Sequence, residues 1–317
     1  MYLKNRRNNL IEKGNTIDRN IVILKGIVKL FGVEMLMEIK LIALDLDGTL
    51  LTSDLKITKN TIDVLNEAMN KGKEVVICTG RTIAELPLEF EHMPYIKYYI
   101  TSNGAIIWDR HHIRMIYENP IPVDDVRKLM DILKPFDLRI ELFALGRVFI
   151  DQYCYDHLDE YGGGNHVEFL RGSRTPVPEI KSFIQEFDEP VDKFNLFFKT
   201  PEQRKEVWDK CVALGFNVTS SFEQNMEVNS KTANKGTALK SLVNRLNIDV
   251  SSVMVVGDQL NDMTMLRYAG HPIAMGNAVD DIKSLATYIT KTNDEDGVAY
   301  AVKKLVLEGE DNENLFF

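Results

Sequence analysis

The chain has 317 residues, of which 44% are hydrophobic and 27% charged, and this length allows about two domains with buried cores. The composition is that of a folded globular protein and excludes a disordered one. The formal net charge is −9 and no long basic block occurs, which argues against a nucleic-acid partner. The three cysteines form no CxxC pair, and their odd number favours a reducing, cytoplasmic environment over a disulfide framework.

Residues 1–36 differ from the rest because they carry seven basic and three acidic residues. The apolar run 21–37 is interrupted by Lys25, Lys29 and Glu34, so it predicts neither a membrane span nor a cleavable secretion signal. It is compatible with an amphipathic surface helix. We favour the other interpretation, an extension upstream of a native start at Met37.

The central feature is a short apolar run, 39–44, that stops at Asp45 and Asp47. Such a run predicts a strand buried on both faces, as in the parallel sheet of an α/β domain. Gly48 bends the chain, so both carboxylates lie at the carboxyl end of the strand, where open α/β sheets bind ligands. Two anions this close require a cation or a proton. This segment alone fits an acidic turn and an active site equally well.

A helix is predicted over 58–72, followed by a second buried strand, 74–78, that ends at Thr79 and Gly80. The threonine hydroxyl and the glycine N–H are donors suited to a phosphate, although a plain strand-to-helix turn has the same residues. Arg81 either orients a substrate anion or is simply solvated.

A third strand is expected at 98–101, before a turn that contains Asn103. The side chain of Asn103 either hydrogen-bonds the substrate or fills a turn position that favours asparagine.

The pattern changes at Pro120 and Pro122, where strands and helices of mixed order begin. We expect helices at 123–133, 178–187 and 201–214, a hairpin of 139–143 with 147–150, and strands at 193–198, 216–220 and 226–229. This mixture predicts an α+β module with one open sheet.

A further helix begins near Lys235, whose ammonium together with the helix dipole can stabilise a phosphoryl group. Lys231 is a nearby competitor for this role. A fourth buried strand, 253–257, then ends at Asp258, with Asn261 and Asp262 following. Carboxylates in this arrangement suit Mg²⁺, which prefers oxygen ligands and keeps several waters.

The segment Asp45-Leu46-Asp47-Gly48-Thr49-Leu50 resembles the first motif of the haloacid dehalogenase-like (HAD) phosphatase superfamily. Thr79-Gly80, Lys235 and the acidic segment from Asp258 are similar to its second, third and fourth motifs. Only 34 residues separate Asp45 from Thr79, whereas 156 separate Thr79 from Lys235. An inserted domain therefore follows the second motif, as in the Cof-type, C2B-capped branch.

The resemblance implies a Rossmann-like α/β core, a parallel sheet with helices on both faces, formed by residues 37–120 and 223–317. An α+β cap at 121–222 is inserted into it.

The resemblance also implies the roles of individual residues. Asp45 would attack phosphorus and Asp47 would serve as general acid and base. Magnesium would bind Asp45, Asp258, the backbone carbonyl of Asp47 and, directly or through water, Asp262. The phosphate and substrate contacts would come from Thr79, Gly80, Arg81, Asn103, Lys235 and Asn261.

The function expected from these features is hydrolysis of small phosphorylated metabolites, such as sugar phosphates, by a magnesium-dependent phosphatase through an aspartyl phosphate. A phosphomutase and a non-catalytic regulatory protein of the same fold are the alternatives. The substrate itself and the oligomeric state stay open.

Overall fold

The computed structural model describes residues 38–158, 167–221 and 225–308, together with five short strands before them. These strands pair as β1 (Ile11–Glu12) with β2 (Asn15–Thr16), and β3 (Val22–Leu24) with β4 (Ile27–Leu30) and β5 (Val33–Leu36). The amphipathic helix considered for the extension is thus wrong over the strands between Val22 and Leu36. The sequence there has three runs rich in valine, isoleucine and leucine, each separated by two residues that end in glycine, a pattern that favours antiparallel strands.

The core is built on one eight-stranded sheet in the order β10-β9-β8-β7-β6-β17-β18-β19. Six neighbouring strands are parallel: β8 (Tyr98–Thr101), β7 (Glu74–Cys78), β6 (Leu41–Leu44), β17 (Val253–Gly257), β18 (His271–Ala274) and β19 (Tyr288–Ile289). An antiparallel edge is added by β9 (Ile106–Asp109) and β10 (Arg114–Glu118). The central strand β6 and its neighbour β17 are buried over their whole length, as their apolar sequences predict.

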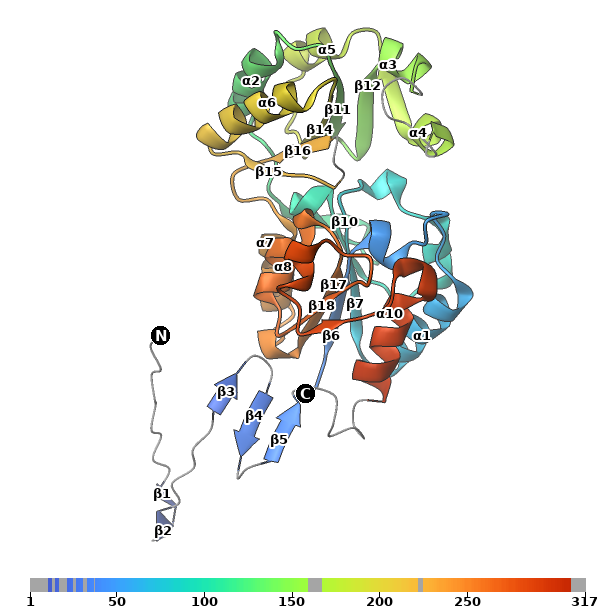
Figure 1. The fold of residues 1–317 in the computed structure, drawn as a ribbon, viewed down its shortest axis with the longest axis vertical. Helices are drawn as coiled ribbons and strands as arrows, with labels where there is room; N and C mark the ends of the chain where they lie inside the picture. The colour runs from blue at the N-terminus through green and yellow to red at the C-terminus, as the bar shows by residue number, and fades with distance from the viewer. Residues whose placement is uncertain are drawn as a thin grey trace.

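Helices cover both faces of this sheet (Figure 1). One face carries α1 (Lys59–Asn70) and α10 (Gly297–Val302), which contact each other, and the other carries α7 (Lys235–Arg245) and α8 (Met263–Tyr268). The expected Rossmann-like α/β core is confirmed. The first strand of this core, β6, lies between β7 and β17, so the carboxyl ends of these three parallel strands meet at one edge of the sheet.

The cap is a six-stranded sheet in the order β13-β12-β11-β14-β16-β15 that lies beyond this edge (Figure 1). Its strands are β11 (Leu138–Ala144), β12 (Arg147–Asp151), β13 (Arg174–Val177), β14 (Lys193–Phe198), β15 (Asn217–Thr219) and β16 (Asn225–Asn229). Its helices are α2 (Val123–Leu133), α3 (Gln152–Asp156), α4 (Val167–Ser173), α5 (Ile180–Glu186) and α6 (Pro201–Ala213). The sequence predicted most of these elements and missed α3, α4 and β13.

The two faces of the cap sheet differ because polar and apolar residues alternate along most of its central strands, although Phe143 and Phe197 fall on the polar face. The residues of one face join the apolar core beneath α2, α5 and α6: Ile140, Leu142, Phe194, Leu196, Met226 and Val228. The other face is polar: Arg139, Glu141, Lys193, Asn195, Asn225 and Glu227. Strand register places Glu141 opposite Asn195, and Asn195 opposite Glu227. This polar face is turned toward the core.

The boundary between cap and core differs from the prediction at one end. Strand β16 pairs with β14 and β15, so the chain returns to the core after Asn229 and not at residue 223. The two linkers between the domains run side by side. The Ser230 hydroxyl lies 2.9 Å from Asn119 Oδ1, and the Asn119 amide donates to Thr232 Oγ1 at 2.9 Å.

Candidate active site

Asp45 lies at the point where the two central core strands end. Its N–H donates to the Val256 carbonyl of β17 at 3.0 Å, which extends the β6–β17 pairing by one residue and buries the carboxylate. Gly48 then turns the chain with φ +77, and a Cβ atom there would lie 2.4 Å from Asp258 Oδ2. Only glycine allows the first-motif loop to close so tightly on the acidic segment after β17.

Lys235 connects this acidic group to the helix α7. Its buried ammonium donates to Asp45 Oδ1 at 2.5 Å and to Asp262 Oδ1 at 2.7 Å. Burial disfavours the charge, but the two carboxylates outweigh it and raise the pKa of Lys235. Lys231 is exposed, so the structure places Lys235, not its competitor, among the acidic residues.

Three buried carboxylates, those of Asp45, Asp258 and Asp262, offer oxygens within 4.8 Å of one another. Burial, followed by the charges of Asp262 and Asp258, raises the pKa of Asp45 well above its usual value. Burial and Asp262 raise the pKa of Asp258 to about 7. One lysine cannot neutralise three carboxylates, so this group of residues favours an additional cation.

The donor set fits magnesium, because every donor is an oxygen. Asp262 already accepts three hydrogen bonds: Oδ1 accepts from Lys235 at 2.7 Å, and Oδ2 accepts from the N–H groups of Asp258 at 2.9 Å and Gln259 at 3.1 Å. It is therefore suited to hold the loop and the lysine in place. Asp45 and Asp258, together with the Asp47 carbonyl, are the residues that would hold the ion.

Asp47 and Arg81 form a bidentate ion pair. Arg81 Nη2 donates to Asp47 Oδ1 at 2.6 Å and Nε donates to Oδ2 at 3.0 Å, while Nη1 donates to the Glu85 carbonyl at 3.0 Å. Arg81 is therefore not simply solvated. The Asp47 carboxylate stays 39% exposed, beside the cavity described below.

The remaining predicted residues divide into a lining group and a supporting group. Gly80 and Asn261 line the cavity, whereas Thr79 and Asn103 are buried behind it. Thr79 Oγ1 accepts from the Arg81 N–H at 3.1 Å. Asn103 fills a turn position, with φ 56, and its Oδ1 accepts from Asn261 at 3.3 Å.

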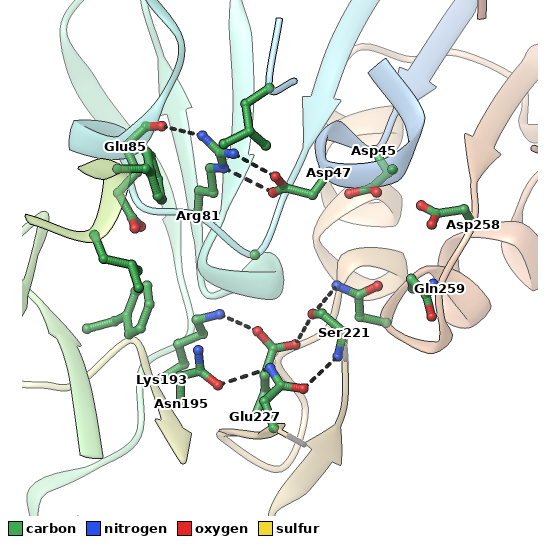
Figure 2. A pocket seen from close by; sticks show the side chains of 18 of the residues that line it. Asp45, Asp47, Arg81, Glu85, Lys193, Asn195, Ser221, Glu227, Asp258 and Gln259 are labelled. Atoms are coloured by element: carbon green, nitrogen blue, oxygen red, sulfur yellow. Dashed lines mark hydrogen bonds and ion pairs between the residues drawn. The ribbon is translucent and has the colours of Figure 1, made fainter. Parts of the chain in front are cut away.

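A cavity of about 740 Å³ separates these residues from the polar face of the cap (Figure 2). Sequence reasoning missed the cap residues that line it, among them Arg139, Phe143, Phe169, Arg174, Lys193, Asn195, Asn225 and Glu227. The signal was the alternation of polar and apolar residues in 139–143, 193–197 and 225–229, which indicates a sheet with one polar face.

Comparison with known proteins agrees with this geometry. A family model described as haloacid dehalogenase-like hydrolase matches residues 42–302. The chain belongs to this family. The phosphatase YwpJ of Bacillus subtilis is 35% identical over 84% of this chain and 100% of its own length. The 5-amino-6-(5-phospho-D-ribitylamino)uracil phosphatase YcsE of the same organism is 32% identical over 85% of this chain and 97% of its own.

Solved structures give the same result. A haloacid dehalogenase-like hydrolase from B. subtilis superimposes with a TM-score of 0.74 and 33% identity, over 84% of this chain and 100% of the other. The HAD subclass IIB sugar phosphatase BT4131 has a TM-score of 0.70 and 25% identity, over 84% and 98%. The Cof-type assignment is confirmed, and the protein is an enzyme of the phosphatase class. Within the described residues, no helix is long and apolar enough to cross a membrane.

Proposed function

We propose that this enzyme is a magnesium-dependent phosphatase that hydrolyses monoesters of small phosphorylated metabolites through an aspartyl phosphate. The observation that carries this proposal is the acidic group at the carboxyl edge of the core sheet, where Lys235 bonds Asp45 and a second carboxylate, Asp258, stands close by. The group opens to a cavity of about 740 Å³, a volume suited to a small metabolite.

Asp45 is the proposed nucleophile. One of its oxygens is held by Lys235, which leaves the other to attack phosphorus as the ester oxygen departs. Water then attacks the phosphorus of the aspartyl phosphate, which releases inorganic phosphate and regenerates the carboxylate.

Asp47 is the proposed general acid and base. It donates a proton to the departing ester oxygen and later takes one from the attacking water. Its partly exposed carboxylate borders the cavity, and Arg81 fixes its direction through two hydrogen bonds. In the acid step the proton must be on Asp47, so we expect the pair with Arg81 to loosen when substrate binds.

When bound, magnesium would offset the charge of the acidic group and of the phosphoryl oxygens. Lys235 and the Gly80 N–H, backed by the buried Thr79, are the groups proposed to orient the phosphoryl oxygens. Asn261 borders the same space and contacts Asn103 and Ser221 at 3.3 Å and 3.4 Å.

The relatives support metabolites as substrates, since YcsE is named for a phosphoribityl compound and BT4131 as a sugar phosphatase. A cytoplasmic location is part of the proposal. Cys78, Cys154 and Cys211 are buried free thiols, which suits a reducing compartment.

The test is phosphate release from a panel of sugar phosphates, nucleotides and flavin mononucleotide, with magnesium and with EDTA. We expect release from some members, loss of it with EDTA and recovery when magnesium is restored. Release that is unaffected by EDTA would refute the metal requirement. Magnesium binding without release from any member would shift the assignment to a phosphomutase or a regulatory protein, and phosphoryl transfer to a sugar hydroxyl would separate these two.

A further inference from the structure

The charges of the cap side of the cavity are paired with one another. Arg174 contacts Glu141 with Nη2 at 3.0 Å and also pairs with Glu85 of the core. Arg139 lies 3.6 Å from Glu141, and Lys193 lies 2.6 Å from Glu227. Among the described residues that line the cavity, every lysine and arginine thus faces a carboxylate, including Arg81 beside Asp47. The stretches 159–166 and 222–224, outside the described residues, contain no lysine or arginine.

The pair of Lys193 and Glu227 lies close to the proposed phosphate end. A Cβ atom built on Gly80 would lie 3.3 Å from Lys193 Nζ and 3.4 Å from Glu227 Oε1. The second Glu227 oxygen accepts from the Ser221 hydroxyl at 2.8 Å. Figure 2 shows this chain of groups below Asp47 and Arg81, on the cavity wall. A leaving-group atom bound beside Gly80 would therefore lie near this pair.

The neighbouring wall offers neutral polar groups. Asn225 donates to Asn195 Oδ1 at 3.0 Å, and its own Oδ1 accepts from Ser220 and Ser221. Gln259, Asn261, Asn277 and Asn293 line the core side of the cavity. Three phenylalanine rings line the same cavity, those of Phe143, Phe169 and Phe197. The Phe143 ring centroid lies 4.4 Å from Lys193 Nζ, and Phe197 pairs with Asn225 in the strand register. Amides and a serine hydroxyl beside aromatic rings match a ligand that presents both hydroxyls and C–H groups.

We propose that the cap selects phosphate monoesters whose leaving group is uncharged and rich in hydroxyls, and that Lys193 and Glu227 are specificity-determining residues in this selection. This inference rests on the proposed phosphatase function. A substrate with a carboxylate or a second phosphate on its leaving group would be rejected.

The physical reason is the cost of an unpaired buried charge. An anionic leaving group would need a cation, and each cation on this wall already pairs with a buried carboxylate that would lose this partner. The carboxylates themselves repel an incoming anion. Hydroxyls avoid this cost, because one hydroxyl can accept from Lys193 and another can donate to Glu227 without breaking the pair.

The wild-type test compares matched substrates with and without an anion on the leaving group. The pairs are glucose 6-phosphate with 6-phosphogluconate, fructose 6-phosphate with fructose 1,6-bisphosphate, and erythrose 4-phosphate with 4-phosphoerythronate, and flavin mononucleotide is added as a large neutral case. We expect kcat/KM for the best neutral substrate to exceed that for the best anionic one by about 100-fold or more. Equal values, or a preference for an anionic member, would overturn the inference and leave the phosphatase function intact. Release from no member counts against the proposed function and against this inference with it.

Two variants test the pair itself. Glu227→Gln leaves Lys193 without its carboxylate, so the preference for neutral substrates should shrink by about tenfold, through better use of the anionic members. Lys193→Met keeps the Glu227 carboxylate, so the preference for neutral substrates should not shrink in this variant. Glu206→Gln, on the exposed surface of α6, is the control. If these residues served folding alone, kcat/KM would change equally for neutral and anionic substrates. An unchanged ratio of the two kcat/KM values in folded Glu227→Gln would therefore contradict the assignment to Lys193 and Glu227.

Discussion

The two sides of the cavity handle charge in opposite ways. On the core side, three carboxylates surround one lysine, and burial with mutual repulsion raises the pKa of Asp45 and Asp258. On the cap side, burial of Glu141 is outweighed by Arg174 and Arg139, which lower its pKa. The same holds for Glu227, where Lys193 outweighs burial. The core side is therefore an acidic site that favours a cation, whereas each charged side chain on the cap side has an oppositely charged partner. This difference supports the proposal that the first region carries out the chemistry and the second selects the substrate.

The largest expected effect comes from removing a charge on the core side. Asp45→Asn should lower kcat for phosphate release by at least about 10⁴-fold, because the nucleophile is lost. It should also raise the melting temperature in EDTA, since the folded protein disfavours this charge. Phosphate release and thermal unfolding measure the two effects. Asp63→Asn, on the exposed side of α1, should change neither, and turnover retained by Asp45→Asn would refute the nucleophile assignment.

The equivalent change on the cap side should have the opposite effect on stability. Glu141→Gln leaves the buried Arg174 and Arg139 short of a counter-charge, so we expect the free energy of unfolding to fall by about 3 kcal/mol. Urea denaturation measures this change. Asp209→Asn breaks an exposed pair with Lys205 and should cost below about 0.5 kcal/mol. Equal stability of Glu141→Gln and wild type would show that the cap charges do not depend on one another.

A smaller effect is expected at Asp192, which lies between the two regions. Burial, with a further contribution from Glu118, raises the pKa of Asp192 to about 7, from a usual value of 3.8. The folded protein thus keeps this proton up to a higher pH than the unfolded chain, and stability falls as the pH rises from about 4 to 7. Asp192→Asn removes the titrating carboxyl and with it this pH-dependent fall in the free energy of unfolding.

The advantage of Asp192→Asn over wild type should therefore grow by about 2.5 kcal/mol between pH 5 and pH 8. Urea denaturation at the two pH values measures it, with Asp209→Asn again as the control. An advantage that is constant with pH would contradict the raised pKa.

The sequence was enough to place the acidic residues of the core side because they adjoin the strands that position them. Asp45 and Asp258 directly follow β6 and β17, so a buried apolar run is enough to locate each carboxylate. The three hydrogen bonds that Asp262 accepts and the pairing of Arg81 with Asp47 depend on side-chain directions, which no spacing of residues reveals.

The cap side was missed because its residues come together only through strand register. Glu141, Asn195 and Glu227 are far apart along the chain and become neighbours when β14 pairs with β11 and β16. The position of β16 likewise depends on pairing, which is why the predicted boundary at residue 223 lies before a cap strand and not where the chain returns to the core. The alternation within each strand indicates a polar face but not which residues of the other strands lie beside it.

The hydrogen bonds between the two linkers restrict how the domains can move. Since Asn119 contacts both Ser230 and Thr232, neither linker can lengthen or slide without the other. Two independent tethers would permit translation and twisting in several directions. When the two linkers are bonded to each other at Asn119, the cap can mainly rotate about a single axis that passes through this contact. We therefore expect the cap to open along one path, so that the cavity widens most at the side farthest from Asn119.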